Sequence, residues 1–135
     1  MSELATTYGG VLAAWVVLGG LSLVQALVAD VAAMRTKHTP GMPVTTGHDD
    51  FFFRAVRAQA NTLENLPVFI VLCLAAVLLG ASPSTARTLA WIFVGGRVVH
   101  MLAYYADQRT LRSTAFAASF LALIGLFVVA AATLV

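Results

Sequence analysis

The stretch RAVRAQANTLENLP, residues 54–67, places two arginines, two asparagines and a glutamate in a segment that otherwise has the length and apolar character of a membrane-spanning helix. A charged side chain at bilayer depth costs at least about 2.5–3.5 kcal/mol. Such residues are found facing a protein interior or a water-filled cavity, where they mark functional sites. The stretch therefore predicts a membrane helix and a polar site on the same segment.

The composition of the whole chain is that of a membrane protein. Of 135 residues, 60% are hydrophobic and 10% are charged, and the mean hydropathy is +0.89. Soluble domains average roughly 45–50% apolar and about 25% charged residues. The net charge of +2 is small and the basic residues form no run, which argues against nucleic-acid binding. The single cysteine, Cys73, stands among aliphatic residues and is expected to be buried and unreactive.

Four stretches are long and apolar enough to span a bilayer, which requires about 20 predominantly apolar residues. We expect these spans at residues 8–34, 50–80, 85–107 and 109–135. The first two connections contain Pro and Gly residues that end helices, and the second and third connections are short. Short connections place consecutive helices antiparallel. The sequence therefore predicts a single all-α domain, an up-down bundle of four membrane helices.

Basic residues are unevenly distributed between the two ends of these spans. The end with both termini holds Arg87, whereas the opposite end holds Arg35, Lys37, Arg54, Arg57, Arg109 and Arg112. Lys and Arg accumulate on the cytoplasmic side of membrane proteins. We therefore expect both termini to face away from the cytoplasm and the polar start of the second span to open toward it.

Polar residues share one face on each of two spans. At 100° per residue, one arc of about 100° on the second span contains Asp50, Arg54, Arg57, Asn61, Glu64 and Asn65. On the third span, Arg97, His100 and Tyr104 follow one another at i, i+3 and i+7. Both groups occupy the half of the span at the basic end. They predict a polar cavity, with Arg57, Glu64 and Arg97 facing the bundle interior or a water-filled space.

Two explanations of these polar residues remain open. In the first, Glu64 forms an ion pair with Arg57 or Arg97 that fixes helix packing, and asparagine side chains hydrogen-bond between helices. In the second, the arginines outnumber the carboxylates around them and bind a small polyanion. A guanidinium group suits this task because it holds a carboxylate or phosphate through two parallel hydrogen bonds.

A metal site is not expected. His100 is the one histidine within a predicted span, and no second His or Cys stands at ligand spacing on the same helix. The other two histidines, His38 and His48, lie in the first connection. His100 is therefore interpreted as a hydrogen-bonding side chain rather than a metal ligand.

Two segments, RAVRAQANTLENLPVF (residues 54–69) and GRVVHMLAYYADQRTLRS (residues 96–113), resemble signature regions of the MAPEG family, the membrane-associated proteins of eicosanoid and glutathione metabolism. The family order of Arg, Ala, Asn, Glu and Pro recurs here as Arg57, Ala58, Asn61, Glu64 and Pro67. The similarity extends over about residues 51–116. It implies a homotrimer of four-helix protomers that binds glutathione between subunits near the cytoplasmic face.

The resemblance also implies roles for individual residues. The glutathione-binding positions would be Arg54, Arg57, Asn61, Glu64, Arg97, His100, Tyr104 and Ser113. Arg112 would stabilise the thiolate, because a nearby guanidinium group favours the ionised form of sulfur. Arg35, contributed by the neighbouring subunit, would assist electrostatically or as a proton donor. A hydrophobic co-substrate would enter from the bilayer between the first and fourth helices.

Differences from the better-known family members narrow the expected activity. Phe116 stands where some family enzymes have a tyrosine, and Gln59 and Ala60 stand where some have basic residues. These differences argue against an eicosanoid synthase and favour a general transferase or peroxidase that uses glutathione or another small thiol, in a bacterial inner membrane. The alternative is a non-catalytic accessory or structural subunit of a membrane assembly. A transporter has little support, because no charged path reaches the opposite side.

Overall fold

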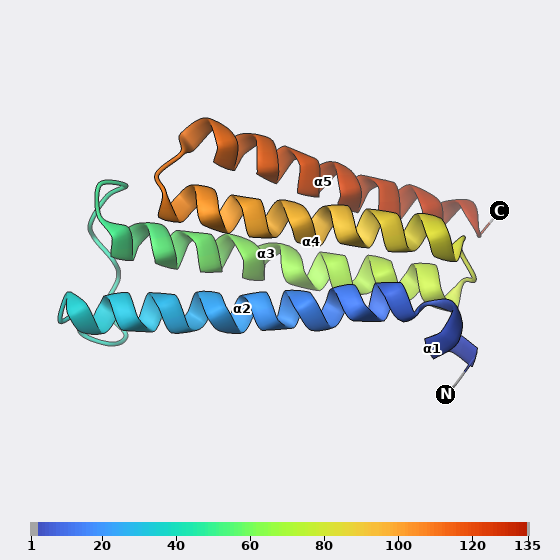
Figure 1. Cartoon of the computed structure of the whole chain (residues 1–135), viewed down its shortest axis with the longest axis horizontal. Helices are drawn as coiled ribbons and strands as arrows, with labels where there is room; N and C mark the ends of the chain where they lie inside the picture. Colours follow the sequence, from blue (N-terminus) through green and yellow to red (C-terminus); the bar gives the residue numbers. More distant parts are fainter. Residues whose placement is uncertain (1–2, 135) are drawn as a thin grey trace.

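The computed structural model describes residues 3–134, and all its regular elements over that range are α-helices. These are α1 (Glu3–Thr7), α2 (Gly9–Arg35), α3 (Phe51–Leu78), α4 (Pro83–Tyr105) and α5 (Arg109–Ala132). The four long helices lie side by side, and consecutive ones run in opposite directions (Figure 1). The predicted all-α class is confirmed. Val135, the last residue of the fourth predicted span, lies outside the described residues.

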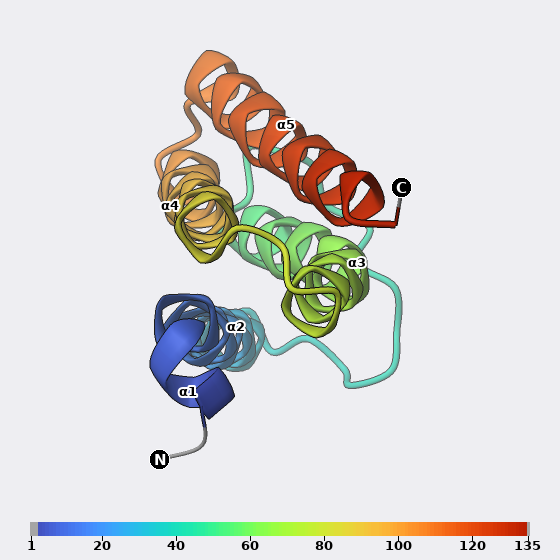
Figure 2. The ribbon, with the colours of Figure 1, turned by 90° about the vertical axis from the view of Figure 1, so that its right-hand side faces the viewer.

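Three helices have the length and composition needed to cross a membrane. They are α2, α3 and α5. In the described part of the chain, α4 does not join them; it is 23 residues long and contains Arg87, Arg97 and His100. Seen along the helix axes, α3 and α4 lie in the middle of the molecule, with α2 and α5 on opposite sides (Figure 2). The predicted span at residues 85–107 therefore stays a prediction.

Residues at the helix ends explain where the chain turns. The Asp50 side chain caps α3 by accepting a hydrogen bond from the backbone N–H of Phe52 at 2.9 Å. Gly80 follows α3 with a φ of +71°, a conformation that glycine adopts without steric cost. Pro83 occupies the first turn of α4, where its missing N–H breaks no helical hydrogen bond. These short turns fold α4 back along α3.

Small and aromatic side chains fill the space between the helices. The rings of Phe69 in α3 and Phe93 in α4 stack with centroids 4.3 Å apart. Cys73 is fully buried in the same core, as predicted. At Gly96, an added methyl carbon would overlap the hydroxyl group of Ser119, so α4 and α5 approach each other closely at this point. This close approach fixes the position of the next residue in α4, an arginine.

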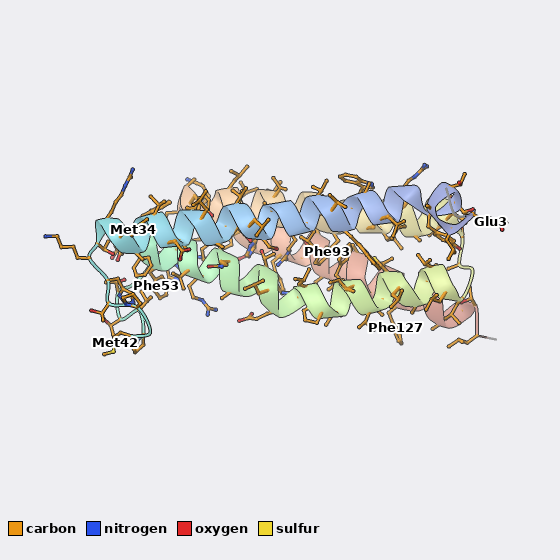
Figure 3. All side chains as sticks on the ribbon, turned by 90° about the horizontal axis from the view of Figure 1, so that it is seen from below. Glu3, Met34, Met42, Phe53, Phe93 and Phe127 are labelled. Carbon is orange, nitrogen blue, oxygen red and sulfur yellow. The ribbon has the colours of Figure 1, made fainter. Side chains whose placement is uncertain are left out.

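Large apolar side chains cover the outer surface of the helices. Phe127 in α5 points outward and is 59% exposed, whereas Phe93 lies between helices (Figure 3). Val16 and Leu23 in α2 are about three-quarters exposed, at 75% and 74%. Soluble monomers rarely expose contiguous apolar patches of more than a few hundred Å². A surface of this kind, continuous along the long helices, is typical of contact with lipid.

Candidate functional site

A cavity of about 300 Å³ lies among α3, α4 and α5, near the connection between α4 and α5. Its lining residues are Asn61, His100, Tyr104, Arg112, Ser113 and Phe116. The first five are residues that the sequence analysis assigned to glutathione binding or catalysis. The structure therefore brings together, from three helices, side chains that are up to 52 positions apart in the sequence. Their chemical roles stay predictions.

Arg97 lies beside this cavity and is 1% exposed, which confirms that it faces the interior. Its Nη1 atom donates a hydrogen bond to Asn61 Oδ1 at 2.7 Å. The guanidinium carbon lies 5.5 Å and 5.3 Å from the ring centroids of Phe93 and Phe116. The Nε atom is buried and has no hydrogen-bond partner among residues 3–134. Arg97 is thus held by neutral groups, and its hydrogen-bonded partner is Asn61 rather than Glu64.

Arg112 is held at the edge of the cavity by a ring and by a histidine from the connection between α2 and α3. Its guanidinium carbon lies 4.5 Å from the centroid of the Tyr104 ring. Its Nη1 atom lies 3.3 Å from His48 Nδ1. The backbone carbonyl of His48 accepts a hydrogen bond from Arg54 Nη1 at 2.5 Å. These partners of Arg112 and Arg54 are also uncharged, so the basic end of the molecule keeps an excess of positive charge.

His100 packs into the wall of the cavity. It is 2% exposed, and its ring contacts that of Tyr104 edge-on at a centroid distance of 5.0 Å. Its Nδ1 atom is buried and has no hydrogen-bond partner in the described part of the chain. Across residues 3–134, no group of three or more His, Cys, Asp or Glu side chains is arranged to hold a metal ion. The geometry places His100 as a cavity-lining group.

The positions of Arg57 and Glu64 differ from what the sequence predicted for the single chain. Both were predicted to face the bundle interior or a water-filled space, but both are exposed on the outer face of α3 in the single chain. The reason is the rotation of α3, which turns Ala58 and Thr62 toward the other helices and leaves the opposite side outward. The periodicity groups the polar residues correctly but does not fix what their common face contacts.

Comparison with known proteins identifies the family. A family model described as MAPEG family matches residues 6–132. The chain belongs to the MAPEG family. The resemblance noted in residues 54–69 and 96–113 is thereby confirmed, and together with the three apolar helices it makes the chain a membrane protein.

A curated relative of this MAPEG protein is found in Synechocystis sp.. The chain is 37% identical over 86 residues to "Uncharacterized protein sll1147" of Synechocystis sp.. The matched region covers 62% of this chain and 61% of the relative, so the chain spans less than two thirds of that protein's length.

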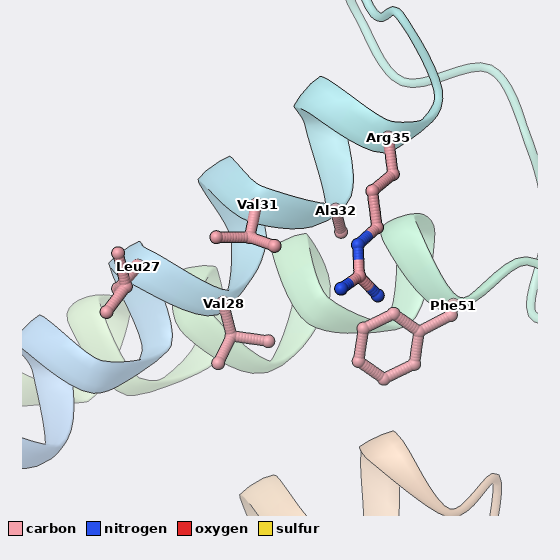
Figure 4. Close-up of a pocket in the computed structure, with 6 residues that line it drawn as sticks. All are labelled: Leu27, Val28, Val31, Ala32, Arg35 and Phe51. Carbon is pink, nitrogen blue, oxygen red and sulfur yellow. The ribbon is translucent and has the colours of Figure 1, made fainter.

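A second cavity in this MAPEG protein contains Arg35. It measures about 360 Å³, and its lining residues are Leu27, Val28, Val31, Ala32, Arg35 and Phe51 (Figure 4). The Arg35 guanidinium group lies beside the Phe51 ring, and aliphatic side chains of α2 form the rest of the wall (Figure 4). Within one chain, Arg35 and Arg112 therefore line different cavities.

Two residues of the site were missed by the sequence analysis. Phe116 was noted only as a difference from other family members, yet its ring lines the cavity and faces Arg97. His48 was set aside as a loop residue, yet it contacts Arg112. Phe116 stands four residues after Arg112, so helical periodicity was a usable signal for it. For His48 the sequence offers no comparable signal, because the contact joins a loop to a helix 64 positions later.

Proposed function

We propose that this MAPEG protein is a membrane-bound transferase or peroxidase that uses glutathione, or another small thiol, against hydrophobic electrophiles or lipid hydroperoxides. The observation that carries the proposal is the uncompensated positive charge at the cavity. Arg97 and Arg112 are held by Asn61, by His48 and by aromatic rings, none of which is an anion. A peptide thiol with two carboxylates supplies the missing negative charge.

The cavity residues suit the activation of a thiol. A thiol reacts as its thiolate, and a guanidinium group near the sulfur favours that form. We assign this role to Arg112, with Arg97, Asn61 and the Tyr104 hydroxyl group as hydrogen-bond donors to the peptide. The Ser113 hydroxyl group donates to the carbonyl oxygen of Arg109, so its oxygen is an acceptor for the peptide. Glu64 and His100 stay candidates for binding the polar groups of the peptide.

In conjugation, the sulfur bonds to an electrophilic carbon and a leaving group departs. In peroxide reduction, the sulfur takes the terminal oxygen, the alkoxide takes up a proton to give the alcohol, and a second thiol forms the disulfide and water.

We propose that the enzyme is a homotrimer, as the resemblance to the MAPEG family implies, and one feature of the single chain supports an oligomer: it leaves charged side chains exposed on a membrane helix. Arg57 and Glu64 are exposed on the outer face of α3, at a cost of at least about 2.5–3.5 kcal/mol for a charged residue facing lipid. A second copy packed on that face covers them and sets the Arg35 cavity of one subunit beside the Arg112 cavity of the next. The apolar wall of the Arg35 cavity then receives the hydrophobic co-substrate. The site faces the cytoplasm of a bacterial inner membrane, with both termini on the other side.

Glutathione binding by the purified protein tests this function. We expect calorimetry to detect binding at millimolar concentration or below and ultraviolet absorbance to detect formation of the thiolate. Arg112→Ala should abolish the absorbance change. Arg87→Ala, at the opposite end of the molecule, is the matched control and should retain it. If the wild-type protein shows neither heat nor thiolate at millimolar glutathione, the proposed function is wrong.

The exposed charges also support a second candidate, an accessory or structural subunit of a membrane assembly. In that case, Arg57 and Glu64 form contacts with a partner, and Arg57→Ala or Glu64→Ala disrupts assembly without changing thiol binding. Native mass spectrometry from detergent micelles measures the assembly, and calorimetry measures the binding. Loss of thiol binding in an intact assembly of either variant favours the enzyme instead.

A further inference from the structure

His48 is the residue through which the connection between α2 and α3 reaches the cavity. Its ring is half-buried and lies between Phe53, in an edge-on contact at 5.1 Å, and Tyr104, in a stacked contact at 6.2 Å. Its carbonyl oxygen accepts the hydrogen bond from Arg54 Nη1. The loop is therefore anchored to α3 by its backbone and to α4 by its ring, and this leaves the Nδ1 edge of the imidazole directed at Arg112 of α5.

The contact between His48 and Arg112 has only one chemically consistent form. An arginine side chain has donors and no acceptor, so His48 Nδ1 must accept the hydrogen bond. The imidazole is then neutral and carries its proton on Nε2. A histidine in this form directs a guanidinium group while adding no negative charge to neutralise it. A carboxylate at the same position would also direct the group, but it would compete with an anionic ligand.

We propose that His48 is a positioning residue that fixes the orientation of the Arg112 guanidinium group toward the cavity. The inference rests on the proposed function, in which Arg112 favours the thiolate. Arg112 has a long, flexible side chain with one face on the Tyr104 ring. That contact sets the plane of the guanidinium group, and the hydrogen bond to His48 sets its rotation within that plane. Arg112 is thereby held ready for the sulfur before the ligand arrives.

Three variants separate positioning from general structural effects. His48→Asn places an amide oxygen near the position of Nδ1, so it still accepts the hydrogen bond. His48→Ala removes the acceptor. His38→Ala is the matched control, because His38 lies in the same loop but contacts Met42 O at 3.0 Å and the ring of Phe52 instead of Arg112.

The first measurement needs no ligand. The side-chain 15N–1H signals of Arg112, assigned by their loss in Arg112→Lys, are recorded in detergent micelles. We expect His48→Ala to shift and broaden these signals and His38→Ala to leave them unchanged. Unchanged Arg112 signals in His48→Ala overturn the proposal.

The second measurement follows the thiolate of bound glutathione against pH. In His48→Ala, the acid dissociation constant of the bound thiol should fall about tenfold, which corresponds to about 1.4 kcal/mol. His48→Asn should restore the wild-type value. If His48→Asn behaves like His48→Ala, the proposal is overturned. If the Arg112 signals respond as expected but the wild-type protein forms no thiolate at any pH, the positioning contact is supported and the glutathione chemistry is wrong.

Discussion

Replacing Arg97 with methionine separates a packing role from a ligand-binding role at the centre of the site. Methionine has a similar length and no charge. In the wild-type protein, Arg97 is 1% exposed, donates to Asn61 Oδ1 at 2.7 Å, and lies 5.5 Å and 5.3 Å from the ring centroids of Phe93 and Phe116. These contacts allow the free energy of the substitution to be worked out term by term.

The opposing terms nearly cancel in the folded protein. Placing the charge at membrane depth costs about 2.5–3.5 kcal/mol. The hydrogen bond from a charged donor contributes about 1.5–3 kcal/mol, and two cation–π contacts contribute about 0.5–1 kcal/mol each. Arg97→Met should therefore change the free energy of unfolding by no more than about 2.5 kcal/mol. Glutathione affinity should fall tenfold or more, because the ligand loses a charge-assisted hydrogen bond of about 1.5–3 kcal/mol.

The protein contains its own reporter of unfolding. Cys73 is the single cysteine and is fully buried, so a thiol-reactive fluorophore labels it only when the fold opens. Labelling across a dodecyl sulfate series in mixed micelles gives the free energy of unfolding, and calorimetry on separate samples gives the affinity for glutathione. Arg87→Met, at the opposite end of the molecule, controls for the loss of an arginine.

One result would refute the reasoning about Arg97. Removing one partner from a buried polar pair with a structural role typically costs about 3–5 kcal/mol. If Arg97→Met loses that much stability while the folded fraction binds glutathione with unchanged affinity, Arg97 is a packing residue. The uncompensated charge would then be irrelevant to ligand binding.

Two further predictions concern the helices that carry the site. Gly96→Ala pushes a methyl group against Ser119 and should lower the free energy of unfolding by about 1–3 kcal/mol. Adding Ser119→Ala should recover part of this loss in the Cys73 labelling assay. Full additivity of the two changes in free energy would contradict the close packing. Asp50→Ala removes the cap of α3 and should lower the free energy of unfolding by about 1 kcal/mol, whereas Asp50→Asn should retain most of the stability. Equal losses of stability in the two variants would show that capping is not the cause.

The part of the fold set by local chemistry was predictable. Apolar runs indicated the four long helices; Pro and Gly mark the first two breaks between them, and the short polar stretch at residues 107–109 marks the third. The face shared by Arg97, His100 and Tyr104 was also predictable, because positions three, four and seven residues apart lie together on a helix. The cavity residues of α4 therefore followed directly from their spacing.

The rest of the fold and of the site depends on long-range contacts, which the periodicity of the sequence does not determine. The shared face of Arg57 and Glu64 followed from periodicity, but its outward direction depends on how α3 packs against its neighbours. The weaker apolar character of α4 is tolerated because α3 and α5 cover it on two sides (Figure 2). His48 reaches the site only because a loop folds back over the end of the bundle, and loop paths are poorly determined by sequence.

The burial of Cys73 has a consequence for the proposed reaction with electrophiles. Its side chain sits in the core formed with Phe69 and Phe93, and Trp15 packs against that core. The residues that line the cavity beside Arg112 include no cysteine or methionine. In the proposed enzyme, an alkylating reagent in this cavity would therefore react with the bound thiol, which is exchangeable, rather than with a sulfur atom of the polypeptide.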